Sequence, residues 1–184
     1  MKSILVMFMI RKSKISLVPY DPIYFKSTLS IINHPEIMML INGILPVTET
    51  EHEYWSKKAV FKRDSVIFAI TTNSKSEHIG NCGLKNIDNR ARKAELWIYI
   101  GVDYINKGYG IDSIQTLVEY GFNSLNLNRI YVYCIDYNKR AQRSFEKCGF
   151  INEGLFREDI YIGGQYRDTV RMAILRKDFE KRMI

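Results

Sequence analysis

Cysteine and histidine are scarce in this chain, and each scarcity argues against a class of protein or site. The 184 residues include three cysteines with no Cys-x-x-Cys pair: Cys82, Cys134 and Cys148. This pattern argues against a disulfide framework or a zinc site and favours a reducing compartment. The three histidines, His34, His52 and His78, lie far apart. We therefore expect no metal site and interpret these histidines as surface or loop residues.

Long hydrophobic runs are also lacking, so we expect no membrane partner and a cytoplasmic location. The apolar run near the N-terminus is short and ends in Arg11, Lys12 and Lys14 instead of a small-residue cleavage site. A processed signal peptide is therefore disfavoured. We predict that residues 1–13 form an extension or an additional edge strand, with an upstream start as the alternative, and that residues 14–184 form a single domain.

The composition that remains is ordinary for a globular protein but basic in charge. Hydrophobic residues make up 46% and charged residues 26%, and the formal net charge is +7. Such a charge favours anionic partners, such as a nucleotide, a phosphorylated cofactor or nucleic acid. Nucleic acid is the least favoured of these, because the lysines and arginines are spread along the chain and form no basic stretch with interleaved aromatics.

The order of expected elements predicts an α+β fold around a mixed sheet. Strands are predicted at 14–21, 65–73, 78–88, 93–103 and 129–136, and a hairpin at 156–175 turns at Gly163-Gly164. Helices are predicted as two short segments within 22–42, at 48–63, from 111 onward and at 138–150. The helix at 48–63 opens with a capping box, Thr48 and Glu51.

The stretch DYINKGYGIDS, residues 103–113, joins a strand to a helix through two glycines and indicates a phosphate site. A Walker-type loop is excluded because no Gly-Lys-Ser/Thr follows at the required spacing. A dinucleotide fingerprint is disfavoured because Ser113 replaces the third glycine and because five residues, from Tyr104 to the first glycine Gly108, follow Asp103. A loop that holds a pyrophosphate at the free amides of a helix N-terminus fits both observations.

Two further segments give this loop a family context: NLNRIYVYCIDYNKRAQRSFEKCGFINEG and YIGGQYRDTVRMAIL. With the loop, they resemble the GNAT superfamily of acyl-CoA-dependent N-acetyltransferases, especially the branch of spermidine and ribosomal-protein N-terminal acetyltransferases. The resemblance runs from about Lys14 to Phe179. It implies a central mixed, mostly antiparallel sheet, flanked by helices and splayed at the acetyl-CoA strand. It also implies acetyl-CoA as acyl donor, with no metal.

The resemblance also implies which residues contact the cofactor. The family's Q/R-x-x-G-x-G/A loop corresponds to residues 105–110, and the cofactor-binding set is Ile98, Ile100, Ile105, Asn106, Lys107, Gly108, Tyr109, Gly110, Ile111, Asn138 and Phe145. Backbone groups near Ile98 and Ile100 would bind the pantetheine arm, and Asn138 would contact it from the other side of the splay. Asn138 can instead be a plain helix cap, and both roles are compatible. Ile105 departs from the family's Gln or Arg.

The implied reaction is attack of a neutral amine on the thioester in a ternary complex. The amine must lose a proton, and Glu95 is our candidate base. The alternatives for Glu95 are a solvent-facing strand residue and a salt-bridge partner of a nearby arginine. Phe145 stands where many relatives carry the tyrosine that protonates the thiolate, which leaves the general acid open among Tyr133, Tyr137, Tyr161 and Tyr166.

The acceptor is expected to be a primary amine, either a small molecule such as a polyamine or a protein N-terminus. Glu49, Glu51 and Glu53 can face a cationic acceptor or can simply suit a helix N-terminus. The loss of the tyrosine keeps a second function class open, a catalytically weak acyl-CoA-binding sensor or scaffold. A homodimer is an open alternative to a monomer.

Overall fold

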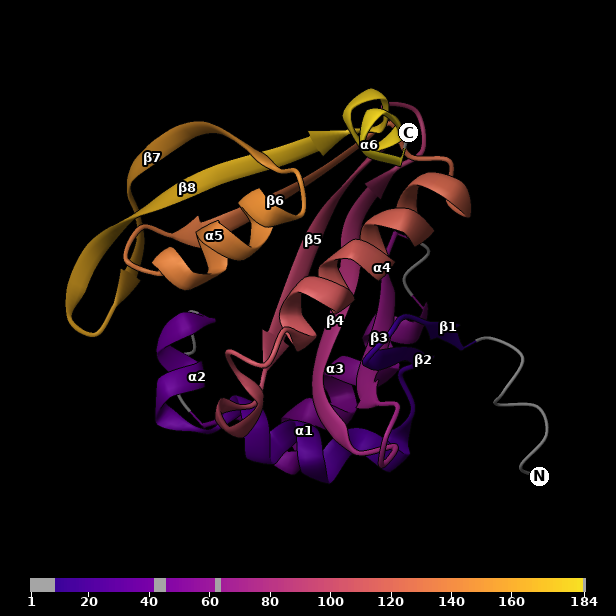
Figure 1. Cartoon of the computed structure of the whole chain (residues 1–184). Helices are drawn as coiled ribbons and strands as arrows, with labels where there is room; N and C mark the ends of the chain where they lie inside the picture. The colour runs from indigo at the N-terminus through magenta and orange to yellow at the C-terminus, as the bar shows by residue number, and fades with distance from the viewer. Residues whose placement is uncertain (1–8, 42–45, 62–63, 184) are drawn as a thin grey trace.

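The computed structural model describes residues 9–41, 46–61 and 64–183. Their strands form one eight-stranded sheet in the order β1-β2-β3-β4-β5-β6-β8-β7 (Figure 1). The strands are β1 Ile10–Arg11, β2 Ile15–Pro19, β3 Val66–Thr72, β4 His78–Asp88, β5 Lys93–Ile100, β6 Arg129–Ile135, β7 Ile151–Ile162 and β8 Gln165–Leu175. Only β5 and β6 pair in parallel, and all other neighbours are antiparallel. The predicted α+β fold with a mixed, mostly antiparallel sheet is confirmed.

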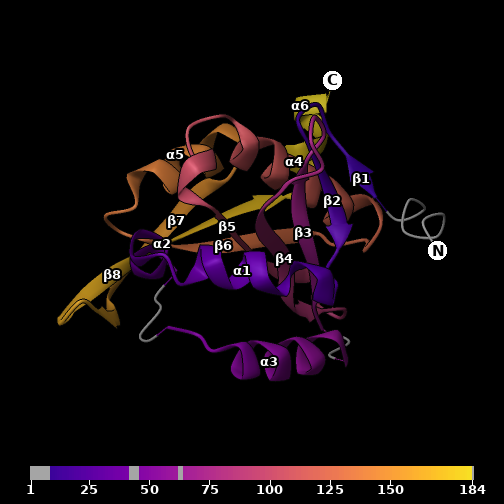
Figure 2. The ribbon, with the colours of Figure 1, turned by 90° about the horizontal axis from the view of Figure 1, so that it is seen from below.

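The helices cover both faces of this sheet. They are α1 Phe25–Ile32, α2 Pro35–Leu40, α3 Glu49–Phe61, α4 Tyr109–Asn123, α5 Lys139–Lys147 and α6 Arg176–Met183, with short 3-10 turns at Pro22–Tyr24 and Val102–Tyr104. Figure 2 shows α1 and α3 on one face and α4 and α5 on the other. The predicted elements match these within a few residues, except that α6 was not predicted. Parts of three predicted segments, residues 1–8, 42 and 62–63, lie outside the described residues.

The main hydrophobic core lies between α4 and the sheet. The predicted apolar face of α4 is buried at Ile114, Leu117, Val118 and Phe122, none more than 2% exposed. It packs in one cluster with side chains from β2 through β6. Because parallel neighbours require a crossover connection, α4 carries the chain from β5 to β6 and covers the sheet where they meet.

The sheet opens between β5 and β6. Only three residue pairs join these strands, Lys93↔Arg129, Ala94↔Ile130 and Glu95↔Tyr131. Beyond them β5 continues along β4 as far as Ile100, whereas β6 continues along β8 as far as Ile135. Figure 1 shows the two strands diverging from this junction. The splay that the family resemblance implied is therefore present.

No described helix is long and apolar enough to cross a membrane. The short strand β1 lies at the sheet edge, where Ile10 pairs opposite Leu17 of β2. The division into an N-terminal extension and a single domain stays a prediction.

Candidate active site

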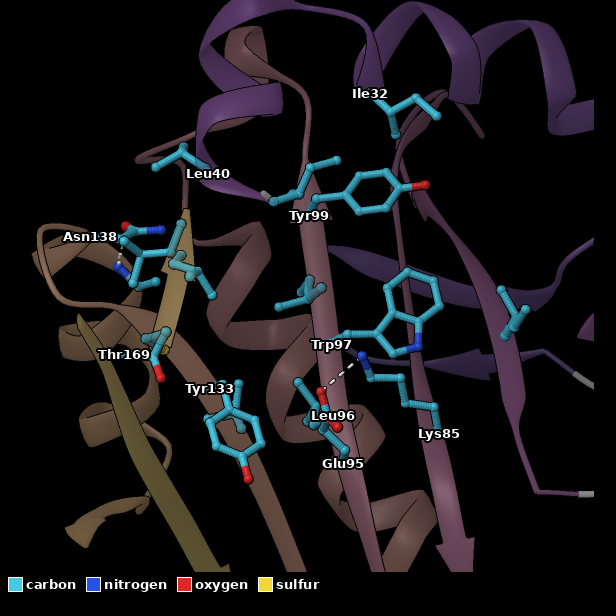
Figure 3. Close-up of a pocket in the computed structure, with 18 of the residues that line it drawn as sticks. Ile32, Leu40, Lys85, Glu95, Leu96, Trp97, Tyr99, Tyr133, Asn138 and Thr169 are labelled. Carbon is cyan, nitrogen blue, oxygen red and sulfur yellow. Dashed lines mark hydrogen bonds and ion pairs between the residues drawn. The ribbon is translucent and has the colours of Figure 1, made fainter. Parts of the chain in front are cut away.

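A cavity of about 950 Å³ occupies the opening and continues over one face of the sheet. Its inner part lies between the diverging strands, lined by Leu96 and Ile98 on one side and by Val132 and Cys134 on the other. Its outer part reaches residues of α1, α2 and α3, including Ile32 and Leu40 (Figure 3). The site therefore has two connected compartments, one in the gap and one between the helices and the sheet.

The edge of β5 presents backbone hydrogen-bonding groups to the gap. The Gly101 N–H donates to the Ile79 carbonyl at 2.9 Å, and the β4–β5 register is regular from Gly80↔Ile100 to Lys85↔Glu95. Since hydrogen-bonded and non-bonded pairs alternate in antiparallel strands, the N–H and C=O groups of Leu96, Ile98 and Ile100 point away from β4. Those of Ile98 and Ile100 face the opening, beyond the last β5–β6 pair at Glu95↔Tyr131.

The glycine-rich loop lies at the wide end of the opening. Gly108 is the N-cap of α4 with φ +85°, a left-handed conformation that favours glycine, and Asn106 is also left-handed at +61°. The amides of Tyr109, Gly110 and Ile111 have no hydrogen-bond acceptor among the described residues. Three free amides at the positive end of a 15-residue helix suit an anionic group.

The loop adjoins the end of β5 without lining the cavity. A Cβ placed on Gly110 would lie 3.7 Å from Ile100 Cδ1, so the strand end and the helix start are in contact distance. Ile98, Asn138 and Phe145 line the cavity, whereas Ile100 and residues 105–111 lie outside its lining. The predicted cofactor residues therefore form two adjacent groups, one in the gap and one at its mouth.

Lys14 is a basic residue at this loop that sequence reasoning did not select. Its ammonium donates to the Lys107 carbonyl at 3.1 Å and lies 3.0 Å from where a Cβ on Gly108 would sit. The carboxylate of Asp112 holds the segment in place by accepting from Ser13 Oγ at 2.8 Å and from the Lys14 amide at 3.1 Å. More than ninety residues separate these partners, so no local pattern could have predicted the contact.

Asn138 and Phe145 belong to the wall opposite β5. Asn138 Oδ1 accepts from the Ala141 amide at 3.1 Å, so Asn138 is the cap of α5 and also borders the cavity. Phe145 is 3% exposed and packs edge-on against Phe150, with ring centroids 5.1 Å apart. It contributes a hydrocarbon surface at this position and no proton donor.

Glu95 lies at the narrow end of the opening, where it forms the last β5–β6 pair with Tyr131. Its Oε1 forms an ion pair with Lys85 Nζ at 2.9 Å, and its Oε2 accepts from Asn86 Nδ2 at 3.1 Å (Figure 3). The side chain is only 14% exposed. A salt bridge is therefore present, as one of the alternatives expected, but its partner is a lysine across the strand pair and not an arginine.

Tyr133 is the cavity-lining residue among the four phenols that sequence left open. Its ring packs edge-on against Tyr131 and Phe156, at centroid distances of 5.8 and 5.7 Å, and the Arg171 guanidinium lies 5.6 Å from its centroid. Tyr137 donates to the Met39 carbonyl at 2.7 Å. Tyr161 and Tyr166 pack on each other in the β7–β8 hairpin.

The interpretation of His52 and His78 as surface or loop residues is wrong. His52 is 3% exposed on α3, with Nε2 2.6 Å from the hydroxyl of Tyr20, and His78 is half-buried in β4. Burial lowers the pKa of both imidazoles, because a charged ring loses hydration there. Burial also raises the pKa of Tyr20 to about 12. His34 is exposed, as expected.

The acids at the start of α3 act first as helix-capping groups. Glu51 accepts from the Thr48 amide at 2.9 Å and from Thr48 Oγ1 at 2.8 Å, which confirms the predicted capping box and lowers the pKa of the Glu51 carboxyl. Glu53 pairs with Lys57 at 2.7 Å. Glu51 nevertheless also lines the cavity. No group of metal-ligating side chains occurs within residues 9–41, 46–61 and 64–183.

Comparisons with known proteins agree with this geometry. Spermidine N(1)-acetyltransferases of Vibrio cholerae and Escherichia coli are each 33% identical over 113 and 103 residues, or 61% and 56% of this chain. The matched segments span 65% and 55% of those enzymes' own lengths. The crystal structure of the V. cholerae spermidine N-acetyltransferase in complex with CoA and spermine superposes with a TM-score of 0.86 at 27% identity, covering 92% of this chain and 99% of that one.

A family model described as the acetyltransferase (GNAT) domain matches residues 14–151. This match covers most of the sheet, the glycine-rich loop and the opening between β5 and β6. The resemblance drawn from the sequence is thereby confirmed, and the chain belongs to the GNAT acetyltransferase family.

Proposed function

We propose that this protein transfers an acetyl group from acetyl-CoA to a primary amine by direct attack in a ternary complex. The observation that carries the proposal is the two-compartment cavity, in which the gap between β5 and β6 opens onto a second space under α1 and α3. A thioester held in the gap would meet an amine entering from that second space. Because the three cysteines are free and buried, we assign the reaction to the cytoplasm.

The cofactor would lie along the edge of β5. The loop from Ile105 to Ile111 would hold the pyrophosphate at the free amides of α4, and backbone groups of Ile98 and Ile100 would bind the pantetheine arm. Asn138 and Phe145 would contact the arm from the opposite wall. This placement uses groups that otherwise lack partners: three helix amides and an unpaired strand edge.

Glu95 would receive a proton as the amide forms. Attack by a neutral amine gives a tetrahedral intermediate with a positively charged nitrogen, which must lose a proton before or during loss of the thiolate. Glu95 borders the narrow end of the gap, and the Lys85 ion pair keeps its carboxylate in position. Backbone N–H groups on the gap side of β5 would donate to the oxyanion.

Tyr133 is our candidate for the acid that protonates the thiolate in place of the family tyrosine. It reaches the cavity from β6, on the face opposite Phe145 and α5. Tyr133→Phe should lower kcat by about 10²-fold, the usual contribution of a positioned acid. Phe145→Tyr in that background should restore part of the rate. Unchanged kcat in Tyr133→Phe would exclude this role, and Tyr166→Phe is the matched control.

The cavity lining suits a cationic amine. Glu51, Asp64 and Glu95 bring carboxylates to it, and Trp55 and Trp97 bring aromatic rings that attract cations. Both a polyamine and a protein N-terminus are cationic amines of this kind. The matched enzymes are named for a polyamine, spermidine.

Binding and turnover test the proposal separately. Acetyl-CoA at a hundred times its Kd should stabilise the fold by about 2.7 kcal/mol, and a melt unchanged by acetyl-CoA would contradict the proposal. Release of free CoA is then screened with polyamines, peptides and amino sugars, and Glu95→Gln should lose kcat while keeping acetyl-CoA affinity. Binding without turnover on any amine would favour the sensor alternative, although the named relatives are N-acetyltransferases.

A further inference from the structure

A chain of buried hydrogen bonds connects α3 to the centre of the sheet. Tyr20 donates to Thr28 Oγ1 at 2.9 Å, and Thr28 donates to Asn81 Oδ1 at 3.1 Å. Tyr99, which borders the cavity, donates to the same oxygen at 3.1 Å. At the other end, Tyr20 Oη lies 2.6 Å from His52 Nε2. Thr28 and Asn81 are fully buried, so water is excluded from the middle of this chain.

With Asn81 oriented so that its Oδ1 accepts from both Thr28 and Tyr99 and its Nδ2 has no partner, counting protons along this chain assigns the tautomer of His52. An amide oxygen only accepts, so the single hydroxyl proton of Thr28 is committed to Asn81. The single hydroxyl proton of Tyr20 is then committed to Thr28. Tyr20 can therefore only accept from His52, and the proton of the neutral imidazole must lie on Nε2. The other ring nitrogen, Nδ1, carries a lone pair.

This lone pair belongs to a ring that lines the cavity. The His52 ring is stacked on Trp55 at a centroid distance of 5.4 Å and meets the edge of Phe25 at 5.0 Å, which fixes its orientation. Its Nδ1 has no hydrogen-bond partner among the described residues. The titratable groups near it are Tyr20 at the end of β2 and Glu51 on α3, with the Lys85–Glu95 pair elsewhere in the cavity lining.

His78 has the opposite arrangement. Ser27 donates its proton to the Tyr24 carbonyl at 3.0 Å, so His78 Nδ1, 2.7 Å from Ser27 Oγ, must be the donor in that contact. The lone pair of His78 is therefore on Nε2, which is enclosed and lacks a partner. His78 does not line the cavity. The two histidines thus differ in whether the ring that carries the unpaired nitrogen lines the cavity.

We propose that Nδ1 of His52 accepts the proton that a cationic amine must lose before it attacks the thioester. This inference rests on the proposed function and adds a residue to it. An ammonium gives up two protons on becoming an amide: the first leaves before attack and passes to His52, and the second leaves the tetrahedral nitrogen and passes to Glu95. One proton is returned to the sulfur as the carbon–sulfur bond breaks, so the reaction releases one proton overall.

The environment of the ring is suited to this task. Burial lowers the pKa of His52, so the imidazole is neutral near pH 7 and its lone pair is available. Uptake of a proton at Nδ1 leaves the Nε2–H bond to Tyr20 intact. The network therefore needs no rearrangement when the ring becomes charged.

The tautomer is tested first, on the protein without substrates. Nitrogen-15 NMR of histidine-labelled protein should show the proton of His52 on Nε2 above pH 7. Tyr20→Phe removes the acceptor of that proton and should shift the population toward Nδ1–H. A proton on Nδ1 of the wild-type ring would overturn the proposal, whatever the protein acetylates.

Turnover tests the role. At about pH 7 the amines of spermidine, with pKa values near that of lysine at about 10.4, are mostly protonated, whereas a peptide α-amino group with pKa near 8 is mostly neutral at about pH 8.5. His52→Gln keeps a donor to Tyr20 but has no basic nitrogen. We expect it to lower kcat for spermidine on the order of 10²-fold and to leave kcat for the peptide Ala-Gly-Ala at the higher pH within about threefold.

His78→Gln is the matched control, because it perturbs the second buried histidine without changing the cavity. It should lower stability to a similar extent and leave the ratio of the two rates unchanged. Equal losses for both amines in His52→Gln would show a merely structural role and overturn the proposal. Failure of the proposed function is distinguishable, since it would appear as a wild-type melt unchanged by acetyl-CoA.

Discussion

Replacing Thr28 with valine removes the central hydroxyl of the buried network while keeping the shape of the side chain. Thr28 is fully buried, accepts from Tyr20 and donates to Asn81. In the variant, Asn81 Oδ1 still accepts from Tyr99, whereas Tyr20 loses its acceptor on Thr28 and can donate only to His52 Nε2, which must then carry no proton. Losing a buried hydrogen bond and displacing that proton should cost about 1–3 kcal/mol. We expect the free energy of unfolding to fall by about 2 kcal/mol.

Differential scanning calorimetry measures this effect. In a domain of this size 1 kcal/mol corresponds to about 2–4 °C, so Tm should fall by about 4–8 °C. Thr116→Val is the matched control, since Thr116 is 1% exposed but donates only to the Asp112 carbonyl of its own helix, at 2.7 Å. The control should cost less than about 1 kcal/mol, because that carbonyl keeps its helical partner. Equal Tm values for the two variants would refute the proton count along the network.

Three further predictions concern pH, phosphate binding and packing. Burial lowers the pKa of both His52 and His78, so the unfolded chain binds protons below about pH 6.5 while the folded protein does not. In urea titrations, the free energy of unfolding should therefore be highest above that pH and should decrease at lower pH. A free energy of unfolding that stays constant from pH 7.5 to 5 would contradict this. Lys14→Met should raise the Kd for acetyl-CoA about two- to fivefold in calorimetry, less at high salt, and an unchanged Kd would remove Lys14 from the site. Gly83→Ala should destabilise by at least about 2 kcal/mol, because its Cβ would lie 2.3 Å from a carbonyl oxygen of β3, whereas Gly154→Ala, with no atom within 4 Å, should be nearly neutral in denaturant melts.

Sequence reasoning was most successful where the signal was local. Hydrophobic periodicity predicted the strands and most of the helices, and the capping box at Thr48 predicted the start of α3. The polar helix α6 was missed: it begins directly after β8, and its exposed charged residues give no strong apolar period. The glycine pair at 108 and 110 predicted the phosphate loop, because a left-handed backbone conformation such as that of Gly108 strongly favours glycine.

Contacts between distant segments were beyond the sequence. The neighbours of Glu95 follow from the β4–β5 register, which pairs it directly with Lys85. The burial of His52 depends on how α3 packs over α1 and the sheet, and no spacing within the chain encodes that geometry. Tyr133 was one of four equivalent phenols until the opening of the sheet placed it at the cavity. The fold class could thus be predicted, whereas the polar partners of the site could not.

The three-pair junction between β5 and β6 also has a mechanical consequence. It joins a block of five strands, β1 to β5, to a block of three strands, β6, β8 and β7. The three pairs lie at the start of β5 and of β6, so the two blocks are connected at one end of these strands and separate at the other. Such a junction is a hinge, and small rotations about it change the width of the far end most. The outer compartment takes Trp97 and Tyr99 from one block and Tyr133 from the other. A cofactor lying between the blocks would brace them, so the amine site would reach its final width only after acetyl-CoA has bound, and substrates would add in a fixed order.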